Sequence, residues 1–123
     1  MENNPDYESV EYHLIYAELI RAARHRGTVT YQELAHVVGL PLSGNYMSKR
    51  MGELLGAVAQ NEVSHHRPML SALAVTTAGK PGTGFIPWAE KLGLFHEGDN
   101  PEAFWQDQCQ ACYQTWKQQF TRK

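Results

Sequence analysis

The stretch TYQELAHVVGLPLSGNYMSKRMGELLGAVA, residues 30–59, holds two helical patterns separated by a short turn. Thr30 and Glu33 have the T-x-x-E spacing of a capping box, which predicts that a short helix begins directly after Thr30. Gly39 ends this helix, and apolar residues then recur at helical spacing over residues 46–64. Two helices joined by a short glycine-containing turn are typical of a helix-turn-helix unit.

The segments on either side extend this pattern to a larger fold. Residues 10–26 have a broad apolar face and are followed by a glycine, which predicts a helix before the helix-turn-helix. Residues 68–77 and 83–86 read as two strands joined by the turn AGKPG, with Lys80 at its tip. We therefore predict a mostly α, α+β fold. It is a winged helix-turn-helix of three helices and a β-hairpin wing, with C-terminal helices packed on it.

The length of 123 residues suits one domain. We divide the chain into an acidic N-terminal tail, residues 1–9, and a single winged-helix-like domain, residues 10–123. A last helix is predicted over residues 101–120, because Asn100 is a good cap and Pro101 a good first residue. Its apolar stripe is either core or a surface for a partner, and consists of Trp105, Cys109, Cys112, Trp116 and Phe120. We interpret the two cysteines as buried thiols, since a redox pair usually begins a helix.

Composition and charge narrow the class of protein. A hydrophobic content of 42% and a charged content of 20% are ordinary for a soluble domain. No apolar run approaches the ~20 residues of a membrane helix, and the start MENNPDYESVE lacks the features of a signal peptide, so we expect a cytoplasmic protein without membrane contact. The net charge is −2, but residues 12–81 hold seven bases against four acids. A mildly basic middle fits weak DNA binding better than strong binding.

Three segments of the chain carry a resemblance to a known family. GTVTYQELAHVVGLP, SKRMGELLGAVAQN and RPMLSALAVTTAGKPGTGF resemble the winged-helix domain of the O6-alkylguanine DNA alkyltransferases and alkyltransferase-like proteins, over about residues 12–85. The resemblance implies that Tyr31 presses on DNA near a flipped base and that Lys49 stands at the family's intercalating position. The chain also resembles small uncharacterised bacterial proteins that have R-P-M-L-S-A and P-G-x-G-F motifs.

The same resemblance implies that the family's reaction is absent. The position of the nucleophilic cysteine is Ala72, and Leu73 and Ala74 stand where the family has histidine and arginine. A thiolate nucleophile needs a sulfur atom and a base to activate it, and these residues supply neither. We therefore expect no alkyl transfer and no enzymatic activity, with Ala72 as a vestigial nucleophile position.

Our leading hypothesis is a non-enzymatic module that binds DNA weakly through the third helix and the wing, within a larger assembly or as a homodimer. The start of a recognition helix contacts base edges and phosphates, and exposed bases on a wing contact the backbone. The candidate DNA-binding residues are Tyr31, Gln32, Asn45, Ser48, Lys49, Arg50, Arg67 and Lys80.

Two alternatives from other classes remain open. In the first, the chain is a protein-protein interaction adaptor that docks a partner through the aromatic residues of its last helix. In the second, it is a hydrolase-like enzyme that uses His65, His66 and Ser71, although no G-x-S-x-G sequence surrounds the serine. No cluster of metal ligands and no phosphate-binding loop occurs in the sequence, so we predict neither a metal nor a cofactor.

Overall fold

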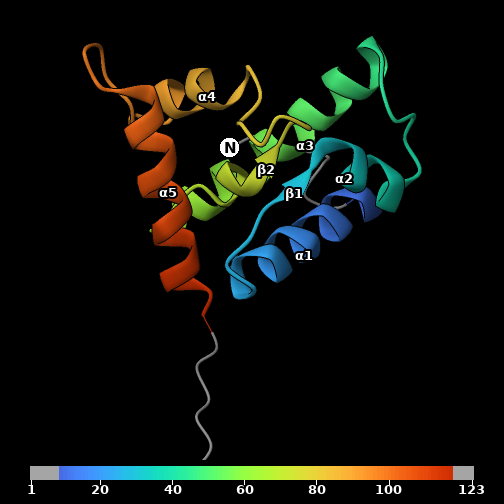
Figure 1. The fold of residues 1–123 in the computed structure, drawn as a ribbon, viewed down its shortest axis with the longest axis horizontal. Coiled ribbons are helices and arrows are strands. Elements are labelled where there is room, and N and C mark those ends of the chain that lie inside the picture. The colour runs from blue at the N-terminus through green and yellow to red at the C-terminus, as the bar shows by residue number, and fades with distance from the viewer. Residues whose placement is uncertain (1–8, 118–123) are drawn as a thin grey trace, which may run out of the picture.

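The structure is a computed structural model and describes residues 9–117 (Figure 1). The described chain is mostly helical with a small parallel sheet, which confirms the expected mostly α, α+β class. In chain order the elements are α1 (Val10–Arg24), β1 (Val29–Thr30), α2 (Tyr31–Val38), α3 (Asn45–Ser64), the 3-10 helix η2 (Leu70–Leu73), β2 (Ala74–Val75), α4 (Phe85–Lys91) and α5 (Pro101–Thr115).

The first three helices form where local signals predict them. The Thr30 side chain accepts a hydrogen bond of 3.0 Å from the backbone of Glu33, whose carboxylate accepts one of 2.8 Å from the Thr30 N–H. This capping box satisfies two backbone donors at the start of α2. Gly39 ends α2 in the left-handed conformation at φ 80°. Gly44 precedes α3, and no side chain caps that helix.

The two predicted strands after α3 are the main correction to the sequence analysis. Instead of a strand over residues 68–77, the chain forms η2 and the two-residue strand β2. β2 pairs in parallel with β1, with Val29 opposite Ala74 and Thr30 opposite Val75. A strand needs a partner for its backbone groups, and β2 finds it in the segment before α2.

The second strand of the predicted wing, residues 83–86, is replaced by the start of α4. The hairpin is reduced to a turn closed by a single antiparallel bridge between Val75 and Pro81. Phe85 and Ala89, four residues apart on α4, are both buried. Residues four apart lie on one face of a helix, and this face of α4 packs into the core.

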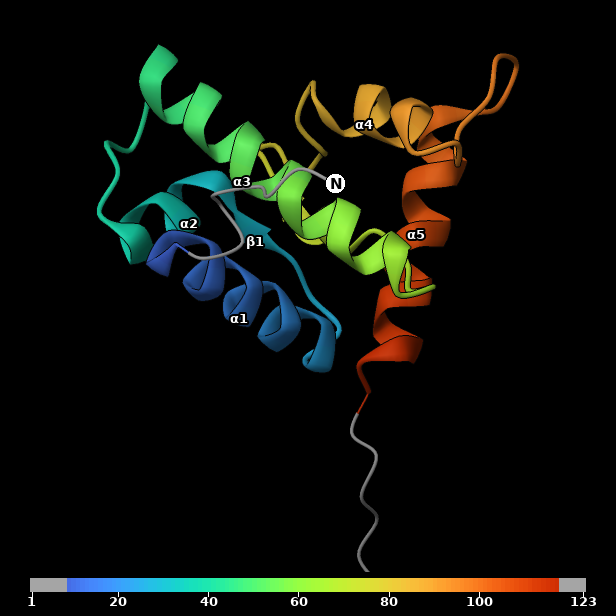
Figure 2. The ribbon, with the colours of Figure 1, turned by 180° about the vertical axis from the view of Figure 1, so that it is seen from behind.

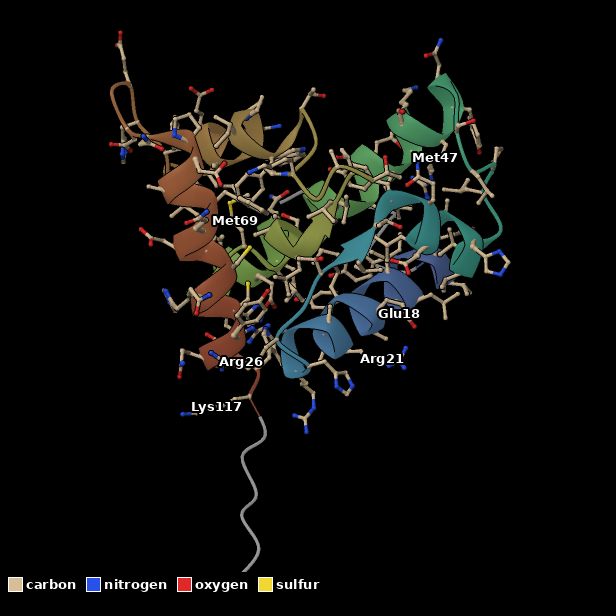
Figure 3. All side chains as sticks on the ribbon, viewed as in Figure 1. Glu18, Arg21, Arg26, Met47, Met69 and Lys117 are labelled. Atoms are coloured by element: carbon tan, nitrogen blue, oxygen red, sulfur yellow. The ribbon has the colours of Figure 1, made fainter. Side chains whose placement is uncertain are left out.

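The core lies where α1, α3 and α5 surround η2, and all four residues of η2 are buried. Met69 lies in this core, at the residue before η2 (Figure 3). α5 packs across the ends of α1 and α3 (Figure 2). Its buried residues include Trp105, Cys109 and Cys112, whereas Phe120 lies outside the described residues. Among the helices of residues 9–117, none has the length and apolar character that crossing a membrane requires.

Candidate functional site

A cavity of about 230 Å³ lies beside the N-terminal half of α3. Its wall combines hydroxyl groups, glycines and apolar side chains from α2, α3, η2 and the segment that leads into α4. The lining residues are Tyr31, Met47, Ser48, Met51, Gly52, Leu55, Gly56, Ser71, Gly82, Thr83, Gly84, Phe85 and Trp88. None of these side chains is charged at neutral pH, so the cavity suits an uncharged part of a ligand.

Tyr31 and Gly82 join two sides of this cavity. The Gly82 N–H donates a hydrogen bond of 2.8 Å to the Tyr31 hydroxyl oxygen. A Cβ atom on Gly82 would lie 2.0 Å from that oxygen, so only glycine fits against the ring. Burial raises the pKa of Tyr31 above its ordinary value, although the bond from Gly82 lowers it. The phenol therefore keeps its proton, which remains available for donation to a ligand.

Trp88 closes another side of the cavity by packing on α3. A Cβ atom on Gly56 would lie 2.3 Å from two carbons of the Trp88 ring, so the indole occupies the space above this glycine. The Lys91 ammonium lies 4.6 Å from the centroid of the same ring. This geometry is that of a cation–π contact and holds the aromatic wall in place.

Ser71 of η2 lines the cavity, whereas Ala72 does not. Ser71 is 9% exposed. Ala72 is fully buried, and its carbonyl oxygen accepts hydrogen bonds from Trp105 and Cys109. The predicted vestigial nucleophile position is thus occupied by a residue that packs against α5.

Several candidate DNA-binding residues do lie together at the start of α3. Tyr31 and Ser48 line the cavity, and Asn45 and Lys49 are exposed in the first turns of α3. Arg50 is half-buried and lies 3.1 Å from the carboxylate of Glu53. Glu53 therefore offsets part of the charge that Arg50 presents to a ligand.

Gln32, the next residue of α2 after Tyr31, is half-buried. Its side-chain oxygen is buried and has no hydrogen-bond partner among the described residues. Buried polar atoms ordinarily have a hydrogen-bond partner. The Gln32 side-chain oxygen, near the start of α2, is therefore available to accept a hydrogen bond.

Arg67 and Lys80 do not join this group. Arg67 follows the C-terminal end of α3, where its guanidinium lies 2.7 Å from the fully buried carboxylate of Glu62. That hydrogen bond to Glu62 raises the pKa of Arg67. Lys80 lies 3.3 Å from Glu102 on α5 and 5.6 Å from the Trp105 ring centroid. Both bases make contacts within the fold: Arg67 pairs with a glutamate five positions before it, and Lys80 with one 22 positions after it.

The residues of the proposed hydrolase-like site are not gathered around the cavity. Ser71 lines it, whereas the exposed His65 and His66 lie at the C-terminal end of α3 and do not. The His65 ring nitrogen Nδ1 lies 2.8 Å from the Asn61 carbonyl oxygen. This contact is local to the end of its helix, which fits capping and not the activation of a serine.

The part of the apolar stripe that the structure describes is largely buried, since Trp105, Cys109 and Cys112 lie in the core. Trp105 and Tyr113 are each 9% exposed, and the Trp116 indole N–H donates to the Glu62 carboxylate at 3.2 Å. Burial raises the pKa of Cys109 to about 11 and raises that of Cys112 further. Across residues 9–117, no three potential metal ligands of the His, Cys, Asp and Glu types lie close enough to hold an ion.

Sequence reasoning missed Gly52, Gly56, Gly82 and Trp88 as parts of the site. One signal was present: Gly52 and Gly56 are two glycines four residues apart inside a helix, where glycine is unfavourable. Such spacing indicates a helix face that another group approaches closely. Nothing in the local sequence identified Trp88 as that group.

Comparisons with models of known protein families, with curated proteins and with solved structures find no match to this chain. The cavity and the residues around the start of α3 are therefore the features from which a function can be inferred.

Proposed function

We propose that this protein is a non-enzymatic DNA-binding module of the helix-turn-helix type that receives an unstacked base in the cavity beside α3. The observation that carries the proposal is the position of this cavity. It opens along the N-terminal half of the second helix of a helix-turn-helix, next to the exposed Asn45 and Lys49. In DNA-binding helix-turn-helix units this part of the second helix approaches the bases.

The chemistry of the wall supports a base as the ligand. Proteins that take up an extruded base hold it with aromatic or apolar side chains and with hydrogen bonds to its edge. Phe85 and Trp88 supply apolar walls, and the hydroxyls of Tyr31, Ser48 and Ser71 supply donors and acceptors. A neutral, flat ring with polar edges matches this combination better than a charged metabolite does.

The proposed binding is weak and electrostatic outside the cavity. Lys49 is an exposed base in this region, and Arg50 shares its charge with Glu53. Arg67 and Lys80 are engaged elsewhere in the fold. Two phosphate contacts are far fewer than the six to ten or so of a strong binder, so affinity depends on the additional energy of base uptake or of a partner.

The absence of catalysis in this proposal follows from the same residues. Ala72 offers no reactive atom, and Ser71 has no neighbouring base in the cavity wall. Both cysteines are buried thiols whose pKa values lie above the ordinary range because of burial. Protonated, buried thiols are poor nucleophiles.

Fluorescence anisotropy at several salt concentrations tests the proposal, with matched duplex and with duplex that contains an abasic site or a mismatch. Lys49→Ala/Arg50→Ala is expected to weaken binding to every duplex and to lower the slope of log affinity against log salt by about two. Gly52→Leu fills the cavity from a position where a Cβ atom meets nothing within 4 Å. This variant should lose the preference for distorted duplex and keep the salt slope.

Two results would contradict the proposal. No binding by the wild type at low salt would remove DNA binding altogether, since electrostatic attraction is strongest there. Equal binding of matched and distorted duplex by the wild type and by Gly52→Leu would remove the cavity from the interaction.

A protein-interaction role remains a second candidate because of exposed apolar side chains elsewhere than on α5. The large apolar side chains that are at least one third exposed to solvent are Val10, Leu14, Val37, Leu42 and Tyr46. Exposed apolar groups of this size are typical of interaction surfaces when they are adjacent. Sedimentation of the wild type and of a Leu42→Ser/Tyr46→Ser variant tests for a homodimer: a dimer that the variant loses supports this role.

A further inference from the structure

The C-terminal ends of α1 and α5 bring exposed bases together, far from the cavity. Arg21 and Arg24 lie in the last turns of α1, Arg26 lies just beyond that helix, and Lys117 lies beyond the end of α5. All four are exposed. Figure 3 shows Arg21, Arg26 and Lys117 along the lower edge of the molecule, whereas Met47, at the cavity, lies at the upper right. We call these four residues the basic end.

Contacts between the two helices hold this arrangement in place. Arg24 Nη1 donates to the carbonyl oxygen of Trp116 at 3.4 Å, and the Arg26 guanidinium lies 5.6 Å from the Tyr113 ring centroid. The Tyr113 hydroxyl donates to the Gly27 carbonyl oxygen at 3.1 Å. Bases that are about ninety positions apart in sequence are therefore part of one surface.

Acidic residues neutralise little of this charge in the described part of the chain. The Glu18 carboxylate lies 3.8 Å from Arg21. The Glu62 carboxylate, also at this end of α3, is fully buried and is paired with Arg67. The basic end thus keeps a net positive charge.

The backbone of Arg26 has a conformation that is uncommon for a residue with a side chain, and His66 at the end of α3 shares it. Arg26 has φ 56°, in the left-handed region. Its N–H bonds the Ala23 carbonyl oxygen at 3.0 Å, and the Gly27 N–H bonds the Ala22 carbonyl oxygen at 2.9 Å. These are the two bonds of a Schellman motif, in which the residue at Arg26 is usually glycine because a side chain there is strained.

The helix dipole accounts for Arg21 and Arg24 but not for Arg26. Bases in the last turn of a helix interact favourably with its C-terminal carbonyl groups. Arg26 lies past that turn, where a strained side chain persists when it contributes something in return. The contact with the Tyr113 ring is one such contribution, but this contact leaves the guanidinium exposed and free to meet an anion.

We propose that the basic end binds the phosphate groups of a nucleic-acid backbone, as a second contact surface separate from α3. Three of its four bases are arginines, whose planar guanidinium group matches phosphate with paired hydrogen bonds. None of the large apolar side chains that are well exposed to solvent in residues 9–117 belongs to the basic end. The surface therefore lacks the apolar anchors of a membrane-bound helix or of a protein-binding hot spot.

The experiment compares variants of the full-length chain in anisotropy titrations with a short labelled duplex and a single strand. Arg26→Gly/Lys117→Ala removes two charges and also relieves the strain at Arg26, so it should unfold at the same temperature as the wild type or higher. Its affinity at low salt is expected to fall about tenfold, and its salt slope to fall by about two. Lys80→Glu is the control, since it lowers the net charge by the same two units elsewhere on the surface and should bind like the wild type.

Three outcomes overturn the proposal. The first is wild-type affinity and salt slope in Arg26→Gly/Lys117→Ala. The second is an equal loss of affinity in the Lys80→Glu control, which would make the effect one of net charge. The third is binding of the wild type to phosphatidylserine vesicles without binding to either nucleic acid, which would assign the surface to lipid headgroups. A failure of the Lys49→Ala/Arg50→Ala variant to change binding bears on α3 alone.

Discussion

The Trp105 indole nitrogen donates a hydrogen bond of 2.8 Å to the carbonyl oxygen of Ala72. This bond joins α5 to η2 across 33 positions of the chain, and the Cys109 thiol donates to the same oxygen at 3.6 Å. It satisfies a buried carbonyl group and orients η2, so Ala72 faces α5 while Ser71 lines the cavity. The C-terminal helix is thereby part of the structure that shapes the candidate site.

Replacement of Trp105 by alanine should lower the free energy of unfolding by ~3–5 kcal/mol, because it removes a buried aromatic ring from the core. Urea denaturation measures this change. Trp105→Phe is the matched control: it keeps an aromatic ring but not the N–H, and should cost ~0.5–1.5 kcal/mol for the lost hydrogen bond to the Ala72 carbonyl. A loss below about 1 kcal/mol in the alanine variant would show that α5 does not stabilise the fold.

The two glycines of α3 should respond to alanine in opposite directions. Gly56→Ala places a methyl group 2.3 Å from the Trp88 ring and should destabilise the protein by ~1–3 kcal/mol. Gly52→Ala meets nothing within 4 Å and should stabilise α3 by up to ~1 kcal/mol. Thermal unfolding of both variants checks the signs. Equal effects would mean that Trp88 does not pack on Gly56 in solution.

Alkaline pH should destabilise the fold through Tyr16. Burial, with a smaller effect of the hydrogen bond to the Glu62 carboxylate, raises the pKa of Tyr16 from 10.0 to about 12. Because the folded value is the higher one, this contribution to stability is complete below pH 10 and is lost as pH rises from 10 to 12. Urea denaturation over this range should show a steeper loss for the wild type than for Tyr16→Phe. Parallel curves would contradict the assignment.

Both cysteines should react slowly with a thiol reagent in the folded protein. Burial raises the pKa of Cys109 to about 11, and burial together with the Cys109 charge raises that of Cys112 further. Little thiolate exists at neutral pH, and the thiolate is the reactive form. Ellman's reagent should therefore modify both residues rapidly only after unfolding in urea. Rapid modification of the folded protein at Cys112 would place that thiol outside the core.

Incubation with duplex that contains O6-methylguanine should leave the mass of the protein and the lesion unchanged. Ala72 has no reactive atom, and Cys109 and Cys112 are buried against η2. Mass spectrometry of the intact chain makes the comparison. Transfer of a methyl group to either cysteine would show that the nucleophile was sought at the wrong position.

The sequence by itself determined the helices whose signals lie within a few residues of one another. The capping box of Thr30 and Glu33 and the Asn100–Pro101 start of α5 form as predicted. Their hydrogen bonds join residues three positions apart, so local sequence carries the necessary information. The same reasoning placed Tyr31, Asn45, Ser48 and Lys49 together around the start of α3.

Only the tertiary structure decided the segments whose partners are distant in sequence. The apolar run before Val75 looked like a hairpin strand, but its parallel partner is Val29, and most of the run became η2. Lys80 was predicted to be a free base, but Glu102, 22 positions later in the chain, lies beside it. The cavity itself depends on the approach of Trp88 to Gly56 and of Gly82 to Tyr31. Burial and pairing are properties of the packed chain, so a local pattern gives the residues available for a site and the packing decides which of them meet.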